Sequence, residues 1–240
     1  MKRRDAKPRL LFVTGTDTGV GKTLFSVCLL RFLRESGVRA VGLKPFCSGD
    51  RSDAKLLRHE SSGSPPLELV NPYFCPIPVA PGVLPRPGYA IPSLSEVVRR
   101  IRAAAEGYDF ALVEGVGGLF APITPRLFVL DLIAALKCSA VLVSPDRLGT
   151  INHTILSFRA LTQRKIPLHK IVMMKNFRAE PSQERNSSFI SEHIAPESVI
   201  GFPKISRWPA LKPVGGRDER FLKKTLATFL PMDIFSPRRC

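Results

Sequence analysis

Short apolar runs alternate along the chain with longer segments in which apolar residues recur at helical spacing. The apolar runs predict buried strands at residues 10–13, 38–43, 110–113, 140–143 and 171–174. The helical spacing predicts helices at residues 24–33, 94–105, 128–136 and 150–164. Strands that are apolar throughout are typical of a parallel sheet covered by helices on both faces. We therefore expect an α/β fold with a mostly parallel sheet between helical layers.

Polar residues mark the predicted ends of some helices. Ser52 is the candidate N-cap of a short helix that follows the second strand. Ser93 and Glu96 form a capping-box pattern, and Gly107 is expected to end the helix that they open.

Nine prolines lie between residues 65 and 92, and they predict an ordered but irregular excursion, expected on the substrate side. The chain shows no internal repeat and no domain break before residue 200. We expect a single domain over residues 1–240, with an unassigned basic tail at about 208–240. The charge of this tail predicts a surface helix around Glu219 to Phe229.

The composition is that of a folded globular protein, with 44% hydrophobic and 23% charged residues in a chain of 240. The formal net charge of +16 could indicate a nucleic acid, an anionic membrane or a small polyanionic ligand. The excess is spread evenly, with a surplus of +8 in residues 1–159 and +8 in residues 160–240. This distribution favours a solvated basic surface over a nucleic-acid-binding arm.

The cysteines and the apolar runs bear on the compartment. Five scattered cysteines without a C-x-x-C spacing argue against a disulfide framework or a zinc site. The apolar run near the N-terminus is too short for a signal sequence, and no run approaches the length of a membrane span. We expect a cytoplasmic protein with no membrane partner.

The segment Gly15–Thr23, with the sequence Gly-Thr-Asp-Thr-Gly-Val-Gly-Lys-Thr, lies between a predicted strand and a predicted helix. Its glycines let backbone N–H groups point into one concavity at a helix N-terminus, which favours phosphate. Lys22 can reach the outer phosphates and the Thr23 hydroxyl can ligate Mg²⁺. Thr16 stands where the usual pattern has glycine. The context nevertheless predicts nucleoside triphosphate binding in a P-loop NTPase-like, Rossmann-type fold, with contacts from Gly19, Val20, Gly21, Lys22, Thr23 and Leu24.

Ligands of an open parallel sheet bind beyond the carboxyl ends of its strands. Five predicted strands end at polar residues: the Gly15–Thr23 loop, Lys44, Glu114, a turn at Ser144 and Pro145, and the pair Lys175 and Asn176. Glu114 could hold Mg²⁺ or be a capping or salt-bridged glutamate, and Lys44 could neutralise charge during phosphoryl transfer or be a surface lysine. The nearby phosphate loop favours the functional role for both. Asp53 could equally bind metal or interact with a helix dipole.

Six motifs follow one another along the chain: Gly15–Thr23, Lys44-Pro-Phe-Cys-Ser-Gly49, Ser52-Asp53-Ala54, Val70-Asn-Pro-Tyr73, Val113-Glu-Gly-Val-Gly-Gly118 and Leu148-Gly-Thr-Ile-Asn-His153. Their order and spacing resemble the dethiobiotin synthetase family, and the resemblance covers about residues 10–205. It implies an ATP- and Mg²⁺-dependent ligase of biotin biosynthesis. Such enzymes form a carbamate on 7,8-diaminononanoate with CO₂, phosphorylate it from ATP and close the ureido ring with loss of phosphate.

The resemblance also implies roles for individual residues. Lys22 and Lys44 would be catalytic and stabilise the carbamate and the transferring phosphoryl group. Thr23, Asp53 and Glu114 would bind Mg²⁺, which makes the metal role of Asp53 the favoured one. The implied substrate contacts are Asp17, Thr18, Ser48, Gly149, Thr150, Ile151 and Asn152, the last four across a homodimer interface. The further implied nucleotide contacts are Asp53, Glu114, Gly115, Val116, Gly117, Asn176 and Pro203.

Two departures from the family pattern concern the substrate and the base. Ala80-Pro81-Gly82 stand where the family has Ser-Pro-His, and Asn176, expected to contact adenine, is displaced by a residue or two. The alternative function is a ParA/MinD-type positioning ATPase that binds DNA or a membrane. Such proteins carry an additional lysine early in the loop, where this chain has Asp17 and Thr18. A basic nucleic-acid-binding protein would rest on charge alone, so nucleic acid is not an expected partner.

Overall fold

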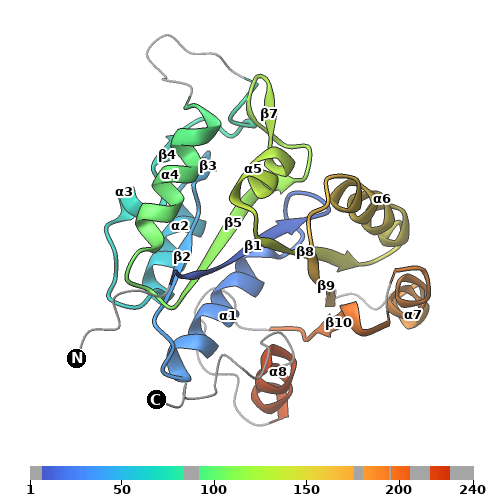
Figure 1. Ribbon diagram of the computed structural model, residues 1–240. Helices are drawn as coiled ribbons and strands as arrows, with labels where there is room; N and C mark the ends of the chain where they lie inside the picture. Colours follow the sequence, from blue (N-terminus) through green and yellow to red (C-terminus); the bar gives the residue numbers. More distant parts are fainter. Residues whose placement is uncertain (1–6, 84–91, 176–180, 195, 206–216, 228–240) are drawn as a thin grey trace.

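A computed structural model describes residues 7–83, 92–175, 181–194, 196–205 and 217–227. Its central feature is a six-stranded parallel sheet with the strand order β10-β9-β8-β1-β5-β2 (Figure 1). The strands are β1 (Arg9–Gly15), β2 (Ala40–Leu43), β5 (Phe110–Gly118), β8 (Ser139–Asp146), β9 (Leu168–Lys175) and β10 (Val199–Phe202). The chain order of the strands reverses about β1, which has β5 on one side and β8 on the other. A ligand crevice opens at such a point.

Helices cover both faces of this sheet (Figure 1). One face packs against α1 (Lys22–Glu35) and α8 (Arg217–Ala227), with α2 (Ser52–Glu60) beside α1. The other face packs against α4 (Leu94–Ala105), α5 (Val129–Leu136), α6 (Thr150–Gln163) and α7 (Gln183–His193). The remaining elements are α3 (Leu67–Val70), the 3₁₀ helix η1 (Pro196–Ser198), and the pairs β3 (Phe46–Ser48) with β4 (Tyr73–Cys75) and β6 (Pro122–Thr124) with β7 (Leu127–Phe128).

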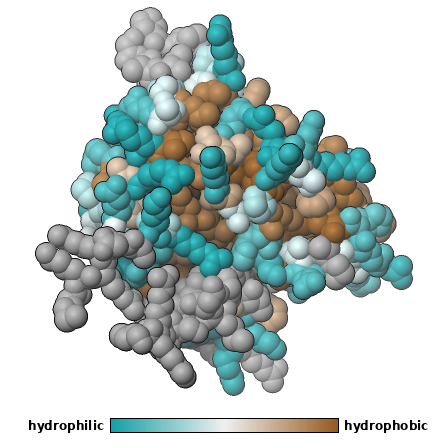
Figure 2. All heavy atoms as spheres, viewed as in Figure 1, coloured by the Kyte–Doolittle hydropathy of each residue, from teal (hydrophilic) through white to brown (hydrophobic). Residues whose placement is uncertain are grey.

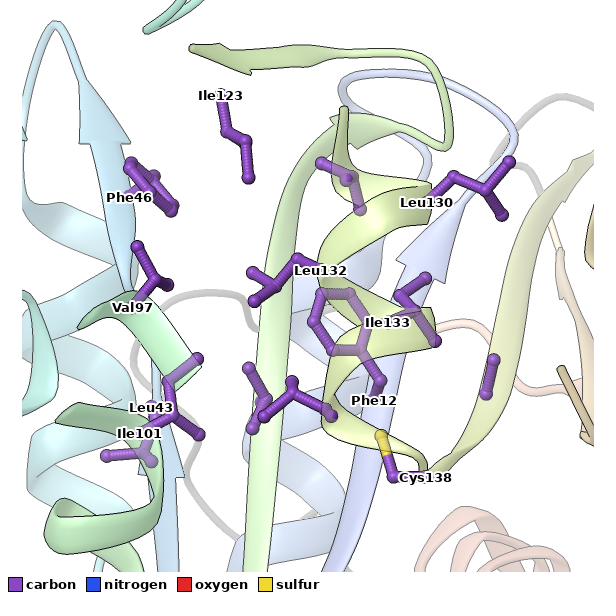
Figure 3. Packing of buried hydrophobic residues seen from close by; sticks show 14 of the residues in the cluster. Phe12, Leu43, Phe46, Val97, Ile101, Ile123, Leu130, Leu132, Ile133 and Cys138 are labelled. Atoms are coloured by element: carbon purple, nitrogen blue, oxygen red, sulfur yellow. The ribbon is translucent and has the colours of Figure 1, made fainter. Parts of the chain in front are cut away.

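Alternate residues of the central strands face opposite helical layers. Leu11 and Val13 of β1 belong to the core under α1, whereas Phe12 packs with residues of α4 and α5. Figure 3 shows this second layer, in which side chains of α4 and α5 point toward the sheet. Burial of a large apolar side chain contributes about 1.5–3 kcal/mol. The central strands are therefore held from both faces, and their ends are fixed in place.

The predicted fold class is confirmed, and so is the existence of each strand and helix placed by periodicity. The Ser93 hydroxyl accepts the N–H of Glu96 at 3.2 Å, and Gly107 follows α4 with φ of +81°. The tail contains α8, while Phe229, the predicted end of that helix, lies outside the described residues.

Three predicted boundaries are wrong. The strand expected to end before Glu114 continues to Gly118, so Glu114 lies within β5. Arg51, not Ser52, is the N-cap of α2, because the Arg51 carbonyl accepts the first helical hydrogen bond, from the N–H of Lys55 at 2.9 Å. Ser144 and Pro145 do not form a turn but continue β8, which stays paired with β9 through Asp146. Proline is tolerated there because the pairing of β8 with β1 has already ended.

The proline-rich excursion is more regular than predicted over its first part. The prolines flank α3 and β4 without interrupting either, and β4 pairs with β3. Further on, the Gly82 N–H donates to the carbonyl of Pro122 at 2.9 Å. A Cβ at Gly82 would lie 2.4 Å from the carbonyl oxygen of Thr124, so this contact requires glycine. Residues 84–91 lie outside the described ranges.

Within the described ranges, no helix combines the length and hydrophobicity needed to cross a membrane. The described cysteines, Cys28, Cys47, Cys75 and Cys138, are buried free thiols. The cytoplasmic location and the single-domain organisation stay predictions.

Candidate active site

The predicted phosphate loop joins the end of β1 to the start of α1. Gly19 and Gly21 have φ of +73° and +100°, the left-handed region that favours glycine. Lys22, the first residue of α1, closes the loop, because its Nζ donates to the carbonyl oxygen of Asp17 at 2.8 Å. The first N–H groups of a helix lack intrahelical partners, so the loop presents donors to an anion.

Lys22 is held with little contact to water. Only 6% of the residue is exposed. Burial, together with repulsion from the nearby Lys44, lowers the pKa of Lys22 to about 8. A bound phosphate would give the Lys22 ammonium a negatively charged partner in place of the neutral carbonyl of Asp17.

Lys44 connects β2, α2 and β5 at one point. It follows β2, and its Nζ donates to Glu114 Oε1 at 2.5 Å, Asp53 Oδ2 at 3.0 Å and the Gly115 carbonyl at 3.2 Å. The Thr23 hydroxyl donates to the same Glu114 oxygen at 2.8 Å. Burial alone would lower the pKa of Lys44, but the charges of Glu114 and Asp53 outweigh it and raise the pKa. Lys44 is therefore a buried ammonium whose charged form is favoured by the two carboxylates.

The residues predicted to bind Mg²⁺ are Thr23, Asp53 and Glu114. Among the described residues, no three His, Cys, Asp or Glu side chains gather as a metal cluster. Mg²⁺ in phosphoryl-transfer sites needs only one or two carboxylates beside water and phosphate oxygens. Here Asp53 and Glu114 both accept from Lys44, and Glu114 also accepts from the hydroxyl of Thr23 at the end of the loop. Glu114 is fully buried, and its Oε2 has no hydrogen-bond partner in the described structure. This donor set fits Mg²⁺.

The segment from Gly149 to Asn152 lies at the carboxyl end of β8, next to the phosphate loop. Gly149 is the N-cap of α6, with φ of +88°. The Thr150 side chain is buried and its hydroxyl lies 2.7 Å from Ser144 Oγ, which also lies 3.5 Å from Thr16 Oγ1 of the loop. The Thr150 hydroxyl therefore faces the interior, and a ligand would meet backbone groups of this turn and the exposed Asn152.

The other predicted residues divide into those near the loop and those away from it. Asp17 and Thr18 are exposed on the loop, and a Cβ on Gly117 would lie 3.6 Å from Thr18 Oγ1. Ser48 ends β3 and is partly buried. Four predicted nucleotide contacts would be made by the backbone more than by side chains. Gly115 and Val116 lie in β5, the side chain of Val20 is in the core, and that of Leu24 packs partly against the core. Pro203 follows β10, and Asn176 lies outside the described residues.

Two buried polar residues near the site were given no role from the sequence. Ser144 was expected only as part of a turn, yet its hydroxyl also contacts Thr154 at 2.8 Å. Asn71 belongs to a motif of the family resemblance, and its side chain donates to the carbonyl of Lys44 at 2.7 Å. In the sequence, each of these two residues stands between a valine and a proline, and a polar residue in such a place is the signal that could have indicated a role.

The features described so far define a P-loop nucleotide-binding ATPase. They are a parallel sheet, a glycine-rich loop from strand to helix with its buried lysine, and a carboxylate on the neighbouring strand β5. A family described as "AAA domain" matches residues 9–208. A protein named ATP-dependent dethiobiotin synthetase BioD from Anaeromyxobacter dehalogenans strain 2CP-C is 41% identical over 207 residues, covering 83% of this chain and 93% of its own. Its namesake from Methanocaldococcus jannaschii is 36% identical over 168 residues, covering 68% and 78%. The chain belongs to the dethiobiotin synthetase family.

Solved structures agree at the level of the fold. A plasmid partition protein from Borrelia burgdorferi B31 bound to AMPPNP aligns with a TM-score of 0.55 and 12% identity, covering 96% of this chain and 98% of its own. The signal recognition particle receptor FtsY from Elizabethkingia anophelis aligns with a TM-score of 0.52 and 14% identity, covering 93% and 66%. Identities this low show the shared fold alone, so the likeness to a partition protein does not favour a positioning ATPase.

Proposed function

We propose that the protein is an ATP-dependent dethiobiotin synthetase. With Mg²⁺, it carboxylates 7,8-diaminononanoate with CO₂ and closes the ureido ring, which yields dethiobiotin, ADP and phosphate. The observation that carries this function is the buried Lys44 between Glu114 and Asp53, beside the phosphate loop, in a chain of this family. The positioning ATPase is not favoured, because the curated relatives are named dethiobiotin synthetase.

The reaction has three bond-forming steps. An amine nitrogen of the substrate bonds to the carbon of CO₂ and loses a proton, which gives a carbamate. A carbamate oxygen attacks the γ-phosphorus of ATP, and ADP leaves. The second amine then attacks the carbonyl carbon of this mixed anhydride, loses a proton, and phosphate leaves as the ring closes.

Two lysines supply positive charge where negative charge gathers in these steps. Lys22 would contact the outer phosphates once it releases the carbonyl of Asp17. Lys44 would face the carbamate and the transferring phosphoryl group from the end of β2. A preorganised buried cation stabilises such charge more than water does, because it needs no reorientation during the step.

Thr23, Asp53 and Glu114 would hold the magnesium ion. When bound, the ion neutralises charge on the phosphate oxygens. The unpartnered Oε2 of Glu114 and the half-exposed carboxylate of Asp53 are the groups of this set with free acceptor capacity. Gly115, Val116 and Gly117 would contact the nucleotide next to these metal-binding groups. Asn176 and Pro203 would contact the adenine base.

The substrate would lie between the loop and α6. Asp17 and Thr18 would line its diamine end, with Ser48 as a further contact. Its carboxylate would bind at the segment from Gly149 to Asn152, because a helix N-terminus attracts anions.

We further propose that this last contact comes from a second copy of the chain. Leu148 and Leu156, on either side of the segment, are 82% and 57% exposed. Figure 2 shows hydrophobic side chains gathered in the middle of one molecular face with hydrophilic ones around them. Burial of Leu148 and Leu156 against a second copy would be favourable, and a homodimer would complete two sites. We also propose that the protein is cytoplasmic.

The decisive experiment measures ADP release by the purified protein with Mg²⁺ and ATP, with and without 7,8-diaminononanoate and bicarbonate. We expect turnover only when both are present, in equal amount with dethiobiotin detected by mass spectrometry. A reaction without bicarbonate, in CO₂-depleted buffer, is the matched control. Turnover indifferent to the diamine, but raised by DNA or by liposomes, would instead identify a positioning ATPase.

A further inference from the structure

A single buried side chain, Asn71, holds the backbone that carries Lys44. Asn71 is 1% exposed, and its Nδ2 donates to the carbonyl of Lys44 at 2.7 Å and to that of Pro45 at 3.3 Å. The N–H of Lys44 donates to the carbonyl of Val70, the residue before Asn71, at 2.9 Å. The peptide groups on both sides of the Lys44 Cα are therefore fixed to two consecutive residues at the end of α3, Val70 and Asn71.

The other end of the same amide fixes the segment that carries Asp53. Asn71 Oδ1 accepts from Arg51 Nε at 2.9 Å, and the Asn71 carbonyl accepts from Arg51 Nη2 at 2.9 Å. Arg51 is the N-cap of α2, and Asp53 lies in the first turn of that helix. Carbonyl oxygens only accept and a guanidinium only donates, so the amide has one consistent orientation.

We infer that Asn71 is a positioning residue, which sets Lys44 and Asp53 relative to Glu114. This inference rests on the proposed function, because Lys44 is a catalytic residue of the proposed reaction. Asn71 touches neither the carboxylates nor the phosphate loop in the described hydrogen bonds, so it acts through Lys44 and Arg51. Its side chain connects β2 to α2 at the point where their two functional residues meet.

Asn71→Asp separates positioning from packing. The aspartate has the same size and keeps an acceptor for Arg51, but an oxygen replaces the Nδ2 donor and faces the carbonyl of Lys44. A displacement of about 1 Å of a catalytic group can cost on the order of 100-fold in rate. We expect kcat to fall by roughly 10- to 100-fold with the KM for ATP within about twofold of wild type.

Ser61→Ala is the matched control. Ser61 is buried, and its Oγ accepts the N–H of Gly42 in β2 at 2.9 Å. The substitution removes two buried hydrogen bonds, this one and the bond that Ser61 Oγ donates to the carbonyl of Leu57 in α2 at 2.7 Å, without touching Lys44. It should lower the free energy of unfolding by about 1–3 kcal/mol and leave kcat unchanged. If Asn71→Asp behaves like Ser61→Ala, Asn71 is merely structural and the inference is wrong.

Arg51→Gln keeps the inference testable should Asn71→Asp fail to fold. This variant keeps Asn71 and Lys44 and removes the hydrogen bonds from Arg51 to Asn71, which connect Asn71 to α2. We expect the binding of a fluorescent ATP analogue to require a several-fold higher Mg²⁺ concentration, and an unchanged Mg²⁺ requirement would overturn the role. If wild-type protein shows no diamine-dependent turnover, the proposed function fails, whereas an active wild type with unaffected variants overturns the role of Asn71 alone.

Discussion

Two lysines of one site have opposite pKa shifts, and their nearest partners explain the difference. Lys22 is paired with a neutral carbonyl and is repelled by Lys44, so burial lowers its pKa to about 8. Lys44 lies between two carboxylates that raise its pKa despite complete burial. Lys44 keeps its charge throughout the physiological range, whereas the charge of Lys22 in the free protein depends on pH.

ATP affinity should therefore fall as pH rises through about 8. The free protein loses the Lys22 proton above that pH, and bound phosphates favour the charged form, so binding must take up a proton. Isothermal titration between about pH 7 and 9.5 should show an affinity loss approaching tenfold per pH unit above 8. Lys22→Arg stays charged and should give a flat profile; a flat profile for wild type would contradict the lowered pKa.

At this scale the sequence predicted residues at strand ends better than residues held by distant partners. Lys44 and Glu114 each follow a run of apolar residues, and the parallel pairing of β2 with β5 brings the two positions together, although β5 continues to Gly118. The inward turn of the Thr150 hydroxyl could not be predicted, because its partner Ser144 was placed in a turn that does not exist. The role of Asn71 depends on a contact across 27 positions, for which no periodic signal exists.

At the scale of elements, the phosphate loop is shaped by a strand beyond its own βα unit. Met174, near the end of β9, lies against the loop: a Cβ built on Gly21 would be 2.9 Å from its Cε. Gly21 is also the N-cap of α1 with φ of +100°. Glycine is thus required there both by conformation and by space.

Gly21→Ala should therefore lower the free energy of unfolding more than a glycine change with conformational strain alone. Gly37→Ala supplies the comparison, because Gly37 has φ of +80° and nothing within 4 Å of its added Cβ. We expect a loss of about 1–2 kcal/mol for Gly37→Ala and roughly 1 kcal/mol or more beyond that for Gly21→Ala. Urea denaturation measures both, and equal losses would show that Met174 moves aside freely.

Elements with a clear period were predictable, and those without one were not. The missed pair β3 and β4 spans three residues each, too few to show alternation. The helix α7 was missed because its sequence is mostly polar, with Ile190 its one fully buried apolar residue among those described. Tertiary pairing, more than local propensity, defines such segments.

At the scale of the whole molecule, the formal charge of +16 opposes the association of two copies. Like charges repel over about 10 Å at 0.1 M salt and over longer distances in dilute buffer. Apolar contacts through exposed residues such as Leu148 and Leu156 would have to exceed this repulsion. The proposed dimer should consequently be more stable at physiological than at low ionic strength.

Sedimentation velocity at both ionic strengths tests the dimer. We expect wild type to dimerise, and Leu148→Asp to be monomeric with a raised KM for the diamine and unchanged ATP affinity. Leu69→Asp, at a residue 39% exposed on α3, is the control and should leave the dimer intact. A wild-type monomer with full activity would rule out a shared site.

The central place of β1 in the sheet has a consequence for how the protein can diverge. On one side, β5 and β2 supply the residues around Lys44, and on the other, β8 leads into the segment at Gly149. Among the described residues, the loop after β1 contacts both halves, through Thr16 to Ser144 of β8 and through Thr23 to Glu114 of β5. Mutations that accumulate in β8 and α6 can alter which acceptor molecule is chosen while the phosphate chemistry is inherited intact, so specificity and energy coupling can evolve at separate rates.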